Sequence, residues 1–70
     1  MSFTYVLMDD DLKEAVLLTQ DPGEIIAKGL DTFARTKHDL SVAKFETQNS
    51  RVVSMRSFED FVIDWKKGQA

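Results

Sequence analysis

The stretch TQDPGEIIAKG, residues 19–29, is the place where the chain changes from strand-like to helix-like sequence. Asp21 suits the N-cap position, because its side chain can accept a hydrogen bond from a free backbone N–H, and Pro22 suits the first helical position. Glu24 complements the positive end of the helix dipole. A phosphate-binding loop would need several glycines before the helix, whereas acids stand here where a phosphate would lie. The stretch therefore predicts the start of a helix.

The residues after Pro22 continue as an amphipathic pattern. Ile26, Leu30 and Phe33 recur at intervals of four and three residues, which predicts a helix over 22–37 with this stripe facing the core. Gly29 is expected on the far side of that helix, at a cost of about 1 kcal/mol relative to Ala.

The residues before the helix predict a β-hairpin. In SFTYVLMD, residues 2–9, apolar and polar residues alternate as in a strand, and the three acids at 9–11 predict a turn. Residues 12–19 are compatible with either a strand or a helix. We favour the strand, because a helix there would have to end and a new one begin within a few residues.

The second half repeats this plan. LSVAKFET, residues 40–47, and VVSMR, residues 52–56, flank a polar turn and predict a second hairpin. Ser57 then suits an N-cap, and Gly68 follows two lysines at the end of an amphipathic stretch, which predicts a helix. The expected fold class is α+β. We expect a single domain over 1–70 with ββαββα order and a four-stranded, mostly antiparallel sheet that carries both helices on one face.

Composition limits the chemistry that is available. The 70 residues include no Cys and one His, so neither a disulfide nor a thiolate or multi-His metal site is possible, and we expect no cofactor and no metal. The N-terminus lacks the pattern of a signal peptide, and no stretch approaches a membrane span, so the expectation is a cytoplasmic protein that does not contact the membrane.

The net charge of −3 is unevenly distributed along the chain. Residues 1–34 carry seven acids and two lysines (−5), residues 35–56 carry five basic and two acidic residues (+3), and residues 57–70 carry three acids and two lysines (−1). The basic segment 35–56 raises the alternative of nucleic-acid binding, although Phe45 is its one aromatic residue and the alternation places Phe45 in the core. The overall acidity makes nucleic acid the weaker alternative.

Candidate catalytic groups have simpler structural explanations. Three consecutive acids at 9–11 cannot all converge on one ion, so a solvated turn is expected there. His38 follows the predicted helix, where a donor near the last carbonyls is stabilising, and no nucleophile is paired with it in the sequence. We expect the chain not to be an enzyme.

The sheet face that the helices leave uncovered is the main candidate for a binding site. We expect Phe3, Tyr5, Leu7, Ala43, Phe45, Val53 and Met55 under the helices, which leaves a second face rich in apolar residues. Either that face is an interaction surface, or a loop or terminus covers it, or the register is shifted by one residue. Together with the acidic turn, the predicted protein-interaction residues are Val6, Met8, Asp9, Asp10, Asp11, Val42, Val52 and Arg56.

In its size, acidity and lack of Cys, the chain resembles small accessory proteins of phages and mobile elements. Many such proteins bind and inhibit a host protein, including anti-CRISPR-like and polymerase-inhibitor types. The resemblance implies a protein-binding module that occludes a surface of a host macromolecular complex in the host-cell cytoplasm. A homodimer is a further expectation. The alternatives are a nucleic-acid-binding accessory protein and a structural subunit of a larger assembly.

Overall fold

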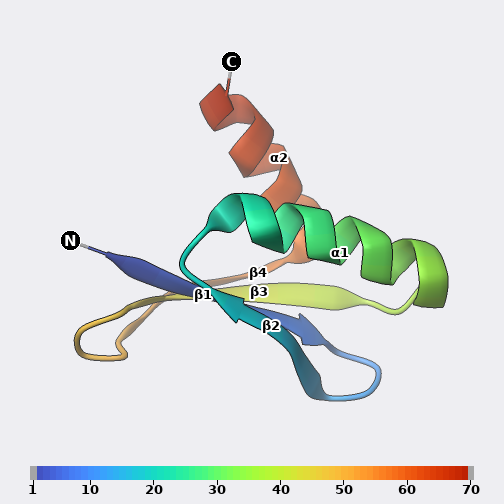
Figure 1. Ribbon diagram of the computed structural model, residues 1–70, viewed down its shortest axis with the longest axis horizontal. Coiled ribbons are helices and arrows are strands. Elements are labelled where there is room, and N and C mark those ends of the chain that lie inside the picture. Colours follow the sequence, from blue (N-terminus) through green and yellow to red (C-terminus); the bar gives the residue numbers. More distant parts are fainter. Residues whose placement is uncertain (1, 70) are drawn as a thin grey trace.

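The computed structural model describes residues 2–69 as one four-stranded antiparallel sheet and two helices (Figure 1). The elements are β1 (Phe3–Asp9), β2 (Glu14–Thr19), α1 (Pro22–Thr36), β3 (Leu40–Glu46), β4 (Val52–Ser57) and α2 (Phe58–Gln69). The α+β class and the ββαββα order are therefore confirmed. Residues 12–19 contain a strand, as the sequence favoured.

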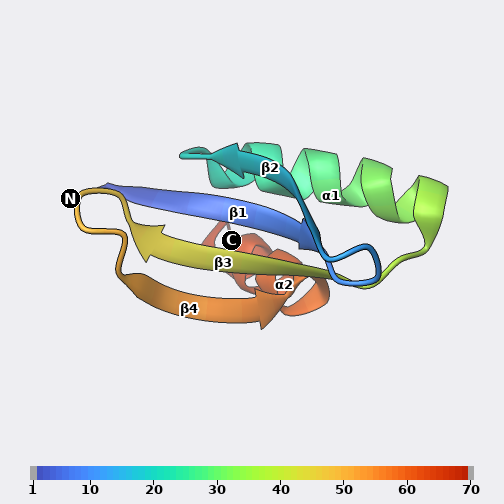
Figure 2. The same cartoon turned by 90° about the horizontal axis from the view of Figure 1, so that it is seen from below.

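Two hairpin-plus-helix halves lie side by side in the order β2-β1-β3-β4. Each half is a hairpin followed by a helix, and the central pair β1–β3 joins the halves in antiparallel fashion. The helix α1 packs against β1 and β2, and α2 packs against β3 and β4. Both helices lie on one side of the sheet in Figure 1, and Figure 2 looks at the sheet from its other side.

The start of α1 confirms the interpretation of the opening stretch. The Asp21 side chain accepts a hydrogen bond from the backbone N–H of Gly23 at 2.9 Å, and Pro22 occupies the first turn. The helix ends where Lys37 adopts a left-handed conformation, with φ of 58°, and donates its N–H to the Phe33 carbonyl. Local sequence signals are therefore sufficient to place this helix.

The buried stripe of α1 differs from the predicted one. The helix buries Ile25, Ile26, Gly29 and Thr32, whereas the side chains of Leu30 and Phe33 remain about half exposed. Gly29 is not on the far side of the helix, because a Cβ at this position would overlap the ring of Phe58 at the start of α2. The two helices meet at this glycine, which turns the buried side of α1 toward both the sheet and α2.

The predicted assignment of faces is correct for β1 and wrong for β3. In β4 it is correct for Val52 and wrong for Met55 and Arg56. Tyr5 and Leu7 lie under the helices, and the register places Leu7 directly opposite Val42 and Asp9 opposite Leu40. Val42 and Leu40 are therefore on the helix side and buried. By the same register, Ala43, Phe45 and Met55 lie on the other face. The strand β3 is apolar at both odd and even positions, so its alternation alone could not choose a face.

Each edge strand carries one β-bulge. The β1–β2 register shifts between Leu7 and Met8, which leaves Val16 as an extra residue in β2. The β3–β4 register shifts between Lys44 and Phe45, which leaves Val53 as an extra residue in β4. A bulge locally increases the twist of its strand, so both outer edges depart from a flat ladder.

The core lies between the sheet and the helices. Its buried members are Leu7, Ile25, Ile26, Leu40, Val42 and Phe58, and partly buried aromatic and aliphatic residues surround them. In the described part of the chain, neither helix has the length and apolar character needed to cross a membrane.

Candidate functional site

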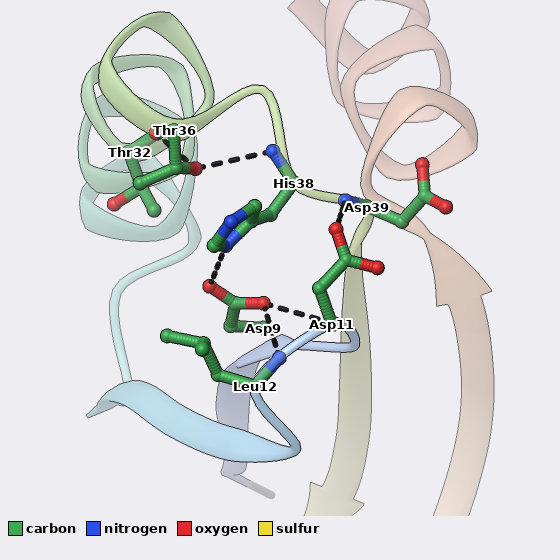
Figure 3. A network of polar contacts seen from close by, with 7 residues as sticks. All are labelled: Asp9, Asp11, Leu12, Thr32, Thr36, His38 and Asp39. Atoms are coloured by element: carbon green, nitrogen blue, oxygen red, sulfur yellow. Dashed lines mark hydrogen bonds and ion pairs between the residues drawn. The ribbon is translucent and has the colours of Figure 1, made fainter.

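A polar cluster ties the β1–β2 turn to the loop between α1 and β3 (Figure 3). Asp9 is buried at the end of β1, and its Oδ1 accepts hydrogen bonds from the backbone N–H groups of Asp11 and Leu12 at 3.0 Å. The Nδ1–H of His38 donates to the Asp9 Oδ2 at 2.8 Å. Asp9 therefore stabilises the β1–β2 turn and also binds His38 in the loop between α1 and β3.

Further hydrogen bonds join the same two segments. The backbone N–H of Asp10 donates to the Asp39 carbonyl at 2.9 Å, and the Ser41 hydroxyl donates to the Asp10 carboxylate at 2.8 Å. The backbone N–H of Asp39 donates to the Asp11 carboxylate. The prediction of a solvated turn therefore holds for the exposed side chains of Asp10 and Asp11, and it is wrong for Asp9.

The Asp9–His38 pair shifts both protonation equilibria. The hydrogen bond from His38 is the main cause that lowers the pKa of Asp9. The hydrogen bond to Asp9 likewise raises the pKa of His38, and the nearby charges of Asp9, Asp11 and Asp39 add to this effect. Burial of the two groups opposes both shifts. The pair is therefore most stable in its charged form.

A charged pair of this kind makes stability depend on pH. The contribution of His38 is complete below its ordinary pKa of 6.5 and is lost as the pH rises through its higher folded value. The contribution of Asp9 is present above its ordinary pKa of 3.8 and is lost as the pH falls through its lower folded value. We expect the urea midpoint of unfolding to be higher at about pH 6 than at about pH 8.5.

The matched variant for this prediction is His38→Gln, which removes the one imidazole of the chain. In this variant the urea midpoint of unfolding should fall less between about pH 6 and about pH 8.5, because His38 is the one side chain of the protein that ordinarily titrates in that interval. An equal decline in the wild type and in His38→Gln would show that the pair is not its cause.

Asp9, Asp11 and His38 also place potential metal-ligand atoms within 4.8 Å of one another. The carboxylate oxygens of Asp9 are already engaged, with two backbone N–H groups on one oxygen and His38 on the other. An ion would have to displace the contacts that hold the turn. The cluster of Asp9, Asp11 and His38 is therefore explained as a structural tie between the β1–β2 turn and the loop that joins α1 to β3.

A groove lies beside this cluster, between α1 and α2. Its volume is about 560 Å³, and its apolar lining consists of Leu30, Phe33, Leu40, Phe58 and Val62. Asp10, Asp39 and Glu59 add three carboxylates, and His38, whose imidazole pairs with Asp9, also lines the groove. The described residues that line the groove include neither Lys nor Arg. Two of these carboxylates belong to the segments that the Asp9–His38 tie holds together. The groove combines an apolar lining with an acidic rim.

The basic residues of segment 35–56 do not form one surface. Arg35 pairs with Asp31 on α1 at 3.0 Å, and the Lys37 ammonium lies 5.4 Å from the centre of the Phe33 ring. Lys44 and Arg56 instead line a smaller pocket of about 270 Å³ on the helix side of the sheet. There they meet aromatic residues from β1 and α2, namely Tyr5, Phe61 and Trp65.

The uncovered face of the sheet is the side opposite the helices. By register it consists of Thr4, Val6, Met8, Ala15, Leu18, Ser41, Ala43, Phe45, Val52, Met55 and Ser57. The side chains of Leu18, Val52 and Met55 expose 64%, 62% and 62% of their surface. Large exposed apolar patches of this kind mark interaction surfaces in soluble proteins.

The predicted interaction residues fall into four places. Val6, Met8 and Val52 lie on the uncovered face, as expected, and Asp10 and Asp11 lie in the acidic turn. Val42 is 1% exposed under the helices, and Asp9 is 3% exposed, so neither offers its side chain to a partner. Arg56 lies on the helix side and pairs with Asp64 of α2.

Sequence reasoning missed the groove and assigned Phe45 and Met55 to the core. The exposure of Leu30 and Phe33 depends on how α1 is rotated, and Gly29 was the signal that could have revealed this rotation. A buried glycine in the middle of a helix often marks the close approach of another element.

No protein-family model, curated protein or solved structure matches this chain.

Proposed function

We propose that this protein is a small, non-enzymatic protein-binding module whose α1–α2 groove receives a basic, partly apolar segment of a partner protein. The observation that carries the proposal is the acidic rim of Asp10, Asp39 and Glu59 around an apolar lining. The lining removes apolar side chains of the partner from water, and the rim attracts its Lys and Arg residues.

Charge complementarity defines the class of partner. A surface that is basic and contains some apolar residues is also the kind of surface that binds nucleic acid. A module that covers such a surface would compete with the nucleic acid and act as an inhibitor by occlusion. The resemblance in size and acidity to phage accessory proteins supports this form of the proposal, with a host macromolecular complex in the cytoplasm as the target.

The test uses a synthetic amphipathic helix made only of Leu and Lys as the probe, with binding followed by isothermal calorimetry. Glu59→Lys should weaken binding roughly five- to tenfold, because it replaces an attraction by a repulsion at the rim. Asp60→Lys is the matched control. Both residues are exposed in the first turn of α2, but Asp60 does not line the groove. Asp60→Lys should change the affinity by less than about twofold.

Two further measurements test whether charge at the groove causes the binding. Binding of the Leu/Lys helix should weaken as salt is added, and the same helix with Glu in place of Lys should not bind. Equal effects of Glu59→Lys and Asp60→Lys, or binding that does not respond to salt, would rule out the acidic groove as the site.

Nucleic-acid binding remains the second candidate because of the pocket that holds Lys44 and Arg56. Aromatic side chains beside cations are the usual means of binding single-stranded nucleic acid, by stacking and by charge. Trp65 lines this pocket and is the one Trp of the chain, so its fluorescence reports directly on an added oligonucleotide. The weaker third candidate, a structural subunit, would require the isolated protein to be unstable.

A further inference from the structure

We propose that the pocket between α2 and the helix side of the sheet binds a small molecule that carries a phosphate on an aromatic ring, as a mononucleotide does. The pocket has a volume of about 270 Å³ and lies where the end of α2 rises away from the strands (Figure 1). This inference does not depend on the α1–α2 groove. It rests on the pocket of the second candidate function and narrows that function from a nucleic-acid strand to a single nucleotide.

The pocket carries positive charge in an acidic protein. Two bases, Lys44 and Arg56, and one acid, Asp64, line it, which gives it a formal charge of +1 in a chain of net charge −3. The two bases are diagonal neighbours on one face of the sheet, because Arg56 is opposite Val42, two residues before Lys44. Like charges at neighbouring positions of a sheet repel each other. An anion that bridges the two bases would relieve this repulsion.

Both bases keep hydrogen-bond donors for such an anion. No carboxylate in residues 2–69 forms an ion pair with Lys44. The Lys44 ammonium instead lies 4.2 Å from the centre of the Phe3 ring and 5.9 Å from that of Tyr5. The rings attract the charge, but the N–H groups of the ammonium remain available to oxygen atoms. Arg56 pairs with Asp64 through one terminal nitrogen, which leaves further N–H groups of its guanidinium for a ligand.

The aromatic wall of the pocket fits a planar ring. Tyr5 and Phe61 meet edge to face with 5.7 Å between their ring centres, and Trp65 follows one turn later on α2. Stacking on aromatic side chains tolerates any base, because every base has a π-face. A ring that stacks on Trp65 can direct an attached phosphate to Lys44 and Arg56, since all three side chains line the same pocket.

Charge and size together favour one phosphate on one ring system. A phosphate monoester has a charge of about −1.5 to −2 and three acceptor oxygens, so it can bind both bases at once, whereas a carboxylate has a single charge. Pockets for drug-sized ligands have volumes of about 300–1,000 Å³. The volume of about 270 Å³ is just below that range and therefore suits a single small ligand.

The test is an NMR titration of the isotope-labelled protein with adenosine monophosphate. The indole N–H signal of Trp65, the one Trp of the chain, reports on the pocket. We expect it to shift with a dissociation constant of about 1 mM, because the ligand is small. Adenosine and inorganic phosphate should each bind at least about fivefold more weakly, since each lacks one of the two contacts. Phenyl phosphate distinguishes the source of the ligand: binding equal to that of the nucleotide supports recognition of any aromatic phosphate, and weaker binding supports a nucleotide.

Two charge variants with matched controls complete the test, after circular dichroism has shown that each variant retains its helices and strands. Lys44→Gln should weaken binding of adenosine monophosphate at least about fivefold. Lys67→Gln, at an exposed lysine of α2 that does not line the pocket, should leave the affinity unchanged. Asp64→Asn removes the acid of the pocket and frees Arg56, so it should strengthen binding about two- to threefold. Asp60→Asn, at an exposed acid one turn earlier on α2, should not.

Three results would overturn the proposal. They are a Trp65 signal that does not move with about 10 mM adenosine monophosphate, equal binding of inorganic phosphate, and equal effects of Lys44→Gln and Lys67→Gln. An oligonucleotide that binds where the mononucleotide does not would also overturn it, while leaving the second candidate function standing. The groove proposal fails separately, because Lys44→Gln should still bind the Leu/Lys helix.

Discussion

Val42→Asn is expected to lower the free energy of unfolding by about 3–5 kcal/mol. Val42 is 1% exposed, and it lies directly opposite Leu7, whose side chain is fully buried. The substitution loses about 1.5–3 kcal/mol of apolar burial and adds about 1–3 kcal/mol for a buried amide without partners. A chain of this length has about 3.5–10 kcal/mol of stability in total, so much of the variant should be unfolded.

Val52→Asn is the matched control for this prediction, and urea denaturation followed by circular dichroism is the measurement. Val52 is on the opposite face of the sheet and is 62% exposed, so the same change should cost less than about 0.5 kcal/mol. The sequence pattern alone had assigned both valines to one face. Equal destabilisation by the two substitutions would contradict the register described here.

Gly29→Ala is expected to lower the free energy of unfolding by about 1–2 kcal/mol, although Ala normally stabilises a helix relative to Gly. The added methyl group would overlap the buried ring of Phe58, and such overpacking costs about 1–3 kcal/mol. The gain in helix propensity offsets up to about 1 kcal/mol of that cost. The midpoint of thermal unfolding should fall by about 4–8 °C for each kcal/mol.

Gly68→Ala is the control for Gly29→Ala, since a Cβ at Gly68 would meet open space. It should leave the thermal midpoint unchanged or raise it slightly. A second test combines Gly29→Ala with Phe58→Leu, in which the smaller side chain makes room for the methyl group. The cost of Gly29→Ala should be smaller in the Phe58→Leu background than in the wild type. Stabilisation by Gly29→Ala alone would show that the two helices do not meet at this glycine.

Local signals in the sequence were sufficient to predict the helices, the strands and their order along the chain. The N-cap at Asp21 and the proline after it place α1, and alternation in residues 2–9 places β1, because each signal depends on neighbours in the chain. The faces of β3 could not be derived in this way. Leu40 and Val42 compete with Ala43 and Phe45 for the core, and only the pairing with β1 decides between them.

The Asp9–His38 tie was beyond sequence reasoning for a different reason. The two residues are separated by the whole of β2 and α1, and either one alone has an ordinary explanation at the end of its own element. Their contact exists because β1 and β3 are adjacent, which brings the end of β1 beside the start of β3. The groove depends on the same adjacency together with the packing of Gly29 against Phe58.

The bulges at Val16 and Val53 affect whether further strands can add to the edges of the sheet. A sheet with a flat outer strand can recruit further strands without limit and grow into a fibre, whereas a twisted, irregular edge resists such addition. Both outer strands here carry a bulge. Growth of the sheet by the addition of strands at either edge is therefore disfavoured, so the irregular edges protect a chain with exposed apolar side chains from forming fibres.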